Sequence, residues 1–227
     1  MSVSLQRDLA MSHQIAASLK EEILAGKYPP GIRIRQENIA DQFKASRSPV
    51  REALRMLEAD GLVKLVAHTG AWIAQLSLQE CEEMYQIRER IEPLMLRLSI
   101  PHLTKSEMNE LAQLTVQMER SSDIEIFLKL DREFHLLSYA GAQTAHLGEM
   151  VQRLWNTTQH YRRAYSKLLA ADGFKSAHYE HHLLLSAIVK QDVDDAERVL
   201  FGHIRRTRLE LAQHPNEFSI RPDKKGH

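Results

Sequence analysis

Residues 46–63, SRSPVREALRMLEADGLV, decide the fold of the N-terminal part of the chain. Apolar residues recur in this stretch with the three- and four-residue spacing of one helix face: Val50, Ala53, Leu54 and Leu57. Ser46 or Ser48 can cap the helix, and Pro49 is tolerated only in a first turn. Gly61 is a natural stop. We therefore expect an amphipathic helix that buries one face.

The flanking sequence predicts two more helices and a β-hairpin around that helix. Ile15, Leu19, Ile23 and Leu24 have helical spacing, and Gly26 with residues 29–31 ends that helix. A short helix is expected over residues 36–43. Apolar runs at 62–66 and 71–76, joined by residues 68–70, indicate a hairpin. Short helices joined by a tight turn and followed by a hairpin describe a winged helix-turn-helix.

After residue 76 the pattern predicts helix after helix and no strand. Capping boxes open helices at residues 77–80 and 104–107. Further helices are expected at 123–140, 145–171, 175–190 and 193–213, the last capped by Asp192. The predicted fold is thus mainly α. A winged helix-turn-helix domain (1–76) precedes an antiparallel all-α bundle (77–215), and a flexible tail covers 216–227.

Composition fits a globular protein of the reducing cytosol. Thirty Lys and Arg balance thirty Asp and Glu, and 43% of residues are apolar, which excludes a disordered or fibrous chain. The longest apolar run, 183–189, is far shorter than the roughly 20 residues that span a bilayer. We expect no signal peptide, because residues 1–20 lack an apolar core. The single Cys81 excludes an internal disulfide. A cytoplasmic, nucleoid-associated protein is expected.

The helix of residues 46–60 carries a candidate DNA-reading face. Arg47, Arg51 and Arg55 follow i, i+4, i+8 spacing and project away from the apolar stripe. An arginine fork can donate to both O6 and N7 of guanine in the major groove. Ser46 and Ser48 lie at the helix N-terminus, where backbone N–H groups favour phosphate.

An arginine stripe can equally be a solvated helix face, and this alternative stays open on spacing alone. Glu52 and Glu58 on the same helix weaken a purely electrostatic argument for DNA. Gly70, at the hairpin tip, could lie against the minor groove or the DNA backbone.

The first part of the chain resembles the N-terminal domain of the GntR family of bacterial transcription regulators. The resemblance lies in GKYPPG at 26–31, Ile39-Ala40, Phe43, SRSPVREAL at 46–54, LEADGLV at 57–63 and Gly70. It implies that Arg47 and Arg51 read bases and that Gly70 lies in the wing.

Two departures from the family pattern concern the operator. Many relatives have a basic base-contacting residue where this chain has Glu37, although Arg35 is close by. The turn before the recognition helix usually carries Gly-Val, but here it is Lys44-Ala45. We therefore expect the operator sequence to differ and the binding mode to be retained.

Four residues of the helical part form a candidate metal site. Asp131 and His135 are four apart and lie on one helical face. His181 and His203, 22 residues apart on two successive antiparallel helices, could meet them inside the bundle. Three imidazoles and one carboxylate suit Zn²⁺, Ni²⁺ or Mn²⁺, of which we expect zinc.

Histidines on apolar helices are more often ordinary core or surface residues, so spacing alone leaves that alternative open. His178 and His182 are competing ligands. Helical phase favours His181, which shares the apolar stripe with Leu184 and Ile188, whereas His182 is rotated by about 100°.

The second part resembles the FCD domain, which defines the FadR subfamily of GntR regulators. The matching segments are RERIEP at 88–93, DREFH at 131–135, residues 180–188 and GHI at 202–204. The resemblance implies that Asp131, His135, His181 and His203 bind a divalent metal. It also implies a small organic acid as effector.

A carboxylate effector needs basic partners besides the metal. Arg88 matches the family's motif and is the preferred anchor. Arg162 and Arg163 are weaker candidates, and Asn156 could add a hydrogen bond.

The resulting prediction is a transcription regulator, a repressor, that binds a short palindromic DNA operator as a homodimer. A metal-dependent hydrolase or lyase is the main alternative, with Glu180 or Glu133 as its base. A structural DNA-binding protein without any ligand is a third.

Overall fold

The computed structural model describes residues 3–67 and 70–218, which divide into two compact units. The first contains the described residues up to Leu76 together with Gln152–His160, and the second contains Ser77–Val151 and Tyr161–Phe218. Helix α7 (His146–Leu169) therefore contributes residues to both units.

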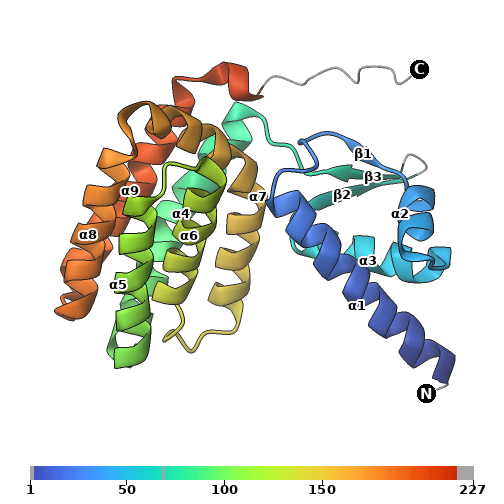
Figure 1. Ribbon diagram of the computed structural model, residues 1–227, viewed down its shortest axis with the longest axis horizontal. Coiled ribbons are helices and arrows are strands. Elements are labelled where there is room, and N and C mark those ends of the chain that lie inside the picture. The colour runs from blue at the N-terminus through green and yellow to red at the C-terminus, as the bar shows by residue number, and fades with distance from the viewer. Residues whose placement is uncertain (1–2, 68–69, 219–227) are drawn as a thin grey trace. The chain divides into compact units, whose positions relative to one another are not determined.

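The first unit is a winged helix-turn-helix, as the sequence predicts. Its elements run in the order α1 (Val3–Leu24), β1 (Arg33–Ile34), α2 (Gln36–Phe43), α3 (Arg47–Ala59), β2 (Val63–Val66) and β3 (Gly70–Ile73) (Figure 1). The three strands form an antiparallel sheet in the order β1-β3-β2, in which Lys64 lies opposite Trp72.

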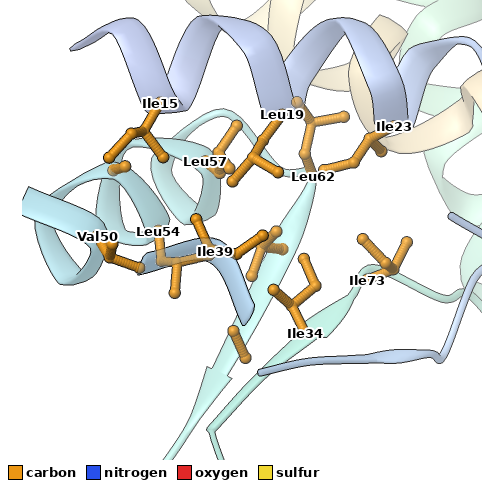
Figure 2. Packing of buried hydrophobic residues seen from close by; sticks show 13 residues of the cluster. Ile15, Leu19, Ile23, Ile34, Ile39, Val50, Leu54, Leu57, Leu62 and Ile73 are labelled. Atoms are coloured by element: carbon orange, nitrogen blue, oxygen red, sulfur yellow. The ribbon is translucent and has the colours of Figure 1, made fainter. Parts of the chain in front are cut away.

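The apolar stripes of α1 and α3 form the core of this unit. Figure 2 shows Ile15 and Leu19 of α1 facing Leu57 of α3. All of the stripe residues predicted for α3 are fully or almost fully buried. Full burial of such a side chain stabilises the fold by about 1.5–3 kcal/mol. The hydrophobic pattern therefore fixes which face of α3 is left for solvent.

Strand β1 was not predicted. Its two residues, Arg33 and Ile34, pair with Trp72 and Ala71 of β3. Two residues are too short to show an alternating pattern, and the pairing depends on a partner almost 40 positions away. Strand β3 ends at Ile73, earlier than the apolar run that reaches Leu76. Residues 68–69 of the predicted hairpin turn lie outside the described residues.

The second unit is an all-helical bundle. Its helices are α4 (Leu78–Ser99), α5 (Lys105–Arg120), α6 (Ile124–Ser138), the C-terminal part of α7, α8 (Lys175–Val189) and α9 (Val193–Ala212) (Figure 1). Helix α4 packs against α9, α5 against α6 and α8, and α8 against α9. Short 3-10 turns lie at Ile100–His102 and Ala170–Asp172.

The predicted caps set the starts of these helices. Both capping boxes are present: Ser77 with Glu80 opens α4, and Thr104 with Glu107 opens α5. The Asp192 side chain accepts a hydrogen bond from a backbone N–H in the first turn of α9. No strand occurs between residues 77 and 218.

Residues 216–218, which the sequence places in a flexible tail, form regular structure instead. They belong to the 3-10 turn Pro215–Phe218, and Phe218 is buried. Its ring stacks on that of Tyr161 at 4.7 Å between centroids, a contact that the local sequence does not reveal. The rest of the predicted tail, 219–227, lies outside the described residues. Within the described ranges, no helix has the length and apolar character needed to cross a membrane.

Candidate metal centre and nucleic-acid interface

The outer face of α3 carries the predicted arginines. Arg47, Arg51 and Arg55 are all exposed, because the opposite face of the helix is buried in the core. Arg47 lies 3.9 Å from a Glu37 carboxylate oxygen, and Arg55 lies 3.3 Å from Glu52. Arg51 makes no ion pair with any described residue. Such exposed pairs are worth little in water, so the face remains suited to phosphates and base edges.

The turn that leads into α3 carries Lys44-Ala45 where the family pattern usually has Gly-Val. Lys44 adopts the left-handed conformation at φ 48°, which glycine takes more easily. Its backbone N–H still donates to carbonyls of the last turn of α2. The lysine therefore keeps the turn geometry at some cost in stability. Ser46 is the N-cap of α3 without a side-chain capping bond, and both Ser46 and Ser48 are exposed.

Two other predicted DNA contacts lie near the sheet. Arg35 is exposed at the N-cap of α2. Gly70 begins β3 at φ 107°, a conformation that L side chains rarely adopt, so glycine is required there.

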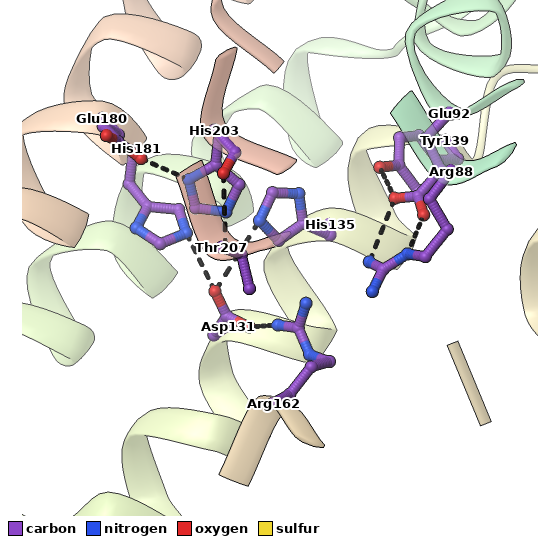
Figure 3. A network of polar contacts seen from close by, with 10 residues as sticks. All are labelled: Arg88, Glu92, Asp131, His135, Tyr139, Arg162, Glu180, His181, His203 and Thr207. Carbon is purple, nitrogen blue, oxygen red and sulfur yellow. Dashed lines mark hydrogen bonds and ion pairs between the residues drawn. The ribbon is translucent and has the colours of Figure 1, made fainter. Parts of the chain in front are cut away.

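The four predicted metal ligands meet inside the bundle. Helix α6 supplies Asp131 and His135, α8 supplies His181, and α9 supplies His203. Their ligand atoms all lie within 4.8 Å of one another, and each residue is at most 8% exposed. The three imidazole centroids are 5.1–5.3 Å apart. Figure 3 shows the side chains pointing at a shared centre. The predicted convergence of the four residues is confirmed.

The protonation state of this cluster suits a metal cation. Burial lowers the pKa of His181 to about 4 and holds the pKa values of His135 and His203 below the ordinary value. The imidazoles are therefore neutral at pH 7, the form that binds metals. Asp131 Oδ1 lies 3.1 Å from His181 Nε2 and 3.7 Å from His135 Nε2. One carboxylate and three neutral imidazoles fit a divalent transition metal.

The competing histidines lie outside the cluster. His182 is exposed, and its Nε2 is 2.5 Å from a Glu119 carboxylate oxygen. His178 packs edge-on against Phe127. The helical-phase argument therefore selected His181, the member of the 181–182 pair that lies in the cluster.

Two buried arginines lie near the cluster, and each is paired with a carboxylate. Arg162 is ion-paired with Asp131. Burial, followed by the nearby charge of Arg88, lowers the pKa of Arg162 to about 9. Arg88 Nε donates to Glu92 Oε1 at 2.5 Å, and the Tyr139 hydroxyl donates to Glu92 Oε2 at 2.8 Å (Figure 3). Arg88 and Glu92 are 1% and 0% exposed.

A small cavity of about 20 Å³ adjoins the cluster, about the space that one water needs. Arg162, Asp131 and His203 are among its polar lining residues, and Phe127 and Leu169 are among its apolar ones. The cavity thus brings one arginine and two predicted metal ligands to a single space.

The remaining predicted effector contacts are placed elsewhere. Arg163 makes a bidentate ion pair with Glu125, at 2.7 and 2.8 Å. Asn156 belongs to the first unit, and its side-chain oxygen accepts a hydrogen bond from Gln152.

Neither candidate general base lines the cavity beside the cluster. Glu133 is exposed on α6. Glu180 contacts His203 Nδ1 at 2.6 Å and also Arg206. This pairing was not predicted, and neither was that of Arg88 with Glu92 and Tyr139. The available signals were the i, i+4 spacing of Arg88 and Glu92 and the position of Glu180 directly before a predicted ligand.

Comparisons with known proteins agree with both units. Residues 11–73 match the bacterial regulatory proteins of the gntR family, and residues 83–206 match the FCD domain. The uncharacterized HTH-type transcriptional regulator YdhC of Bacillus subtilis (strain 168) is 30% identical over 84% of this chain and 86% of the relative. The HTH-type transcriptional repressor GlaR of Escherichia coli (strain K12) is 25% identical over 82% of this chain and 89% of that protein. The solved structure of E. coli McbR/YncC is similar in fold, with a TM-score of 0.79, 23% identity, and coverage of 90% of this chain and 98% of that one.

Proposed function

Since the chain belongs to the GntR family of bacterial regulatory proteins and carries an FCD domain, we propose that it is a transcriptional repressor controlled by a small carboxylate. It binds a short palindromic operator as a homodimer, and the effector is held at a divalent-metal site in the bundle. The family comprises transcription regulators rather than enzymes, which argues against the hydrolase or lyase alternative.

The exposed arginine face of α3 supports the DNA-binding part of this proposal. Arg51 and Arg47 would read base edges, while Arg55, Arg35 and the serines at the helix N-terminus contact phosphates. A two-fold dimer presents two such helices, which requires two related half-sites. The relative GlaR is an HTH-type transcriptional repressor, which supports the assignment of this chain as a repressor.

Asp131, His135, His181 and His203 would hold the metal. A bound divalent ion supplies positive charge and open coordination positions for an anionic ligand. The three imidazoles and one carboxylate favour zinc, with nickel or manganese as alternatives.

The charge balance of the buried cluster is the observation that carries the effector assignment. Asp131 balances Arg162, Glu92 balances Arg88, and the three imidazoles are neutral. A divalent ion would therefore leave about two uncompensated positive charges in a buried site, which is unfavourable without an anion. A carboxylate meets this need. Arg162, which lines the cavity, is the best-placed partner for it, and Arg88 is the second.

The small size of the cavity supports a link between binding and regulation. A space of about 20 Å³ cannot hold an organic acid unless lining side chains move. Effector binding would therefore favour a different arrangement of the bundle. A differential affinity of this kind typically gives a coupling of about 1–3 kcal/mol to DNA binding.

The DNA part is tested by selecting duplexes from genomic fragments with the full metal-loaded chain and then measuring affinity by fluorescence anisotropy. Arg51→Ala should lose about 1–3 kcal/mol of operator affinity while folding normally. Arg198→Ala, an exposed arginine of α9, is the matched control and should bind like the unchanged chain. Unchanged affinity of Arg51→Ala would refute base reading, and an asymmetric footprint would refute the two-fold dimer.

The effector part is tested by a thermal-shift screen of carboxylic acids against metal-loaded and chelated protein. A binding acid should stabilise the folded chain by RT ln(1 + [L]/Kd) and so raise the melting temperature. Chelation of the metal should abolish the rise. A structural DNA-binding protein without a ligand would show no shift with any acid. A shift that survives chelation would separate the effector from the metal.

A further inference from the structure

Glu180 is a partly buried carboxylate that lies beside the proposed metal ligands without being one of them. It directly precedes His181 on α8, and its side chain is 14% exposed. Its Oε2 lies 2.6 Å from His203 Nδ1 on α9, and its other oxygen is ion-paired with Arg206. Figure 3 shows this contact on the side of the His203 ring that faces away from Asp131.

We propose that Glu180 is a positioning residue of the metal centre, which fixes the tautomer and orientation of His203 by accepting the hydrogen bond of its Nδ1–H. This role rests on the metal site of the proposed function. Arg206 in turn holds Glu180, so α9 carries both the ligand and, three residues later, the residue that anchors its partner.

The chemistry of imidazole explains why such a partner is needed. A neutral histidine carries its proton on either Nδ1 or Nε2, and only the nitrogen without the proton can bind a metal. An ionised carboxylate can only accept hydrogen bonds, so Glu180 requires the proton on Nδ1. Nε2 is then left as the ligand atom. His135 and His181 point Nε2 at Asp131. Asp131, unlike Glu180, is itself a proposed ligand, so a metal ion would take the place of a proton between its carboxylate and these nitrogens.

The carboxylate has a second effect on the ligand. A charged acceptor increases the basicity of the imidazole and restricts the rotation of its ring. Loss of such an outer partner typically weakens metal binding by about 10- to 100-fold. Glu180→Ala removes the acceptor, whereas Glu180→Gln keeps an oxygen that can accept and removes only the charge. We therefore expect the larger loss for alanine and a smaller one for glutamine.

The pair of Glu119 on α5 and His182 on α8 offers a matched control. His182 Nε2 lies 2.5 Å from Glu119, but His182 is 46% exposed and Glu119 41% exposed, and neither belongs to the cluster. Glu119→Ala and Glu119→Gln break a carboxylate–imidazole pair of the same kind away from the site. They should leave metal affinity unchanged.

Two measurements on the full chain test the role. Zinc affinity is measured by competition with a chromophoric chelator, and the His203 tautomer is read from ¹⁵N chemical shifts of the metal-free protein. We expect Nδ1–H in the unchanged chain and a mixture of tautomers in Glu180→Ala, together with a zinc Kd raised about 10- to 100-fold. A purely structural role would lower stability without moving the tautomer.

The outcomes separate this role from the metal site itself. Equal zinc affinity of Glu180→Ala and the unchanged chain would overturn the role of Glu180 alone, and so would a proton on Nε2 of His203 in the unchanged chain. No zinc binding by the unchanged chain and by Glu119→Gln would overturn the metal centre and this role together.

Discussion

The buried pair of Arg88 and Glu92 allows a quantitative prediction for the bundle. Glu92→Gln replaces a carboxylate that accepts from Arg88 and from the Tyr139 hydroxyl with a neutral amide. Arg88 then keeps its charge in a site where it is 1% exposed. Burial works against that charge, but Glu92 outweighs it and raises the pKa of Arg88 above its ordinary value.

The expected loss of stability follows from the geometry. Two opposite charges whose centres are about 4 Å apart attract by about 4 kcal/mol at an effective dielectric constant of about 20. Removal of one partner of a buried pair typically costs about 3–5 kcal/mol, because the other charge stays buried without compensation. We therefore expect Glu92→Gln to lower the free energy of unfolding by about 4 kcal/mol. The exposed pair of Glu119 and His182 gives the control, for which Glu119→Gln should cost less than about 1 kcal/mol.

The assay uses Cys81, the single cysteine, which is buried in α4 of the same unit. Its rate of thiol labelling as a function of urea, in chelated protein, reports opening of the bundle. A double variant, Arg88→Met with Glu92→Leu, removes both charges and should recover to within about 2 kcal/mol of the unchanged chain. If Glu92→Gln costs no more than Glu119→Gln, the Arg88 charge is not held by Glu92 and the buried-pair reasoning fails.

Three further predictions follow from single sites. Arg162→Gln should still bind zinc but weaken the zinc-dependent thermal shift by a carboxylate about 10- to 100-fold in Kd, the loss of a charged hydrogen bond. Arg163→Gln is its control, and equal effector affinity of the two variants would exclude Arg162 as the anchor. Lys44→Gly should raise the free energy of unfolding by about 0.5–1 kcal/mol, because glycine adopts φ 48° without strain; a loss in chemical denaturation would contradict this. Burial raises the pKa of Cys81 to about 12, so a thiol reagent at pH 8 should label it only after unfolding. Rapid labelling of the native chain would disprove that burial.

The sequence by itself predicted the helices, the buried and exposed faces of α3 and, through the family resemblance, the four residues that meet in the buried cluster. Side-chain periodicity is a local property, so the stripe of Val50, Leu54 and Leu57 already separated the core from the arginine face of α3. The capping boxes at Ser77 and Thr104 involve residues within one helical turn, so the local sequence also predicted where α4 and α5 begin. Helical phase was enough to choose His181 over His182.

Only the tertiary structure decided which distant segments contact one another. Pairing of β1 with β3, stacking of Phe218 on Tyr161, and the contact of Glu180 with His203 all join segments that are distant in sequence or on different helices. Such contacts depend on how helices pack, to within a fraction of an ångström, and no periodic pattern encodes that distance. The ion pair of Arg162 with Asp131 is of the same kind. The sequence ranked Arg162 below Arg88 as an effector contact, but Arg162 is the arginine that lines the cavity. Which arginine faces the cavity depends on how the helices pack, and the sequence pattern does not show that.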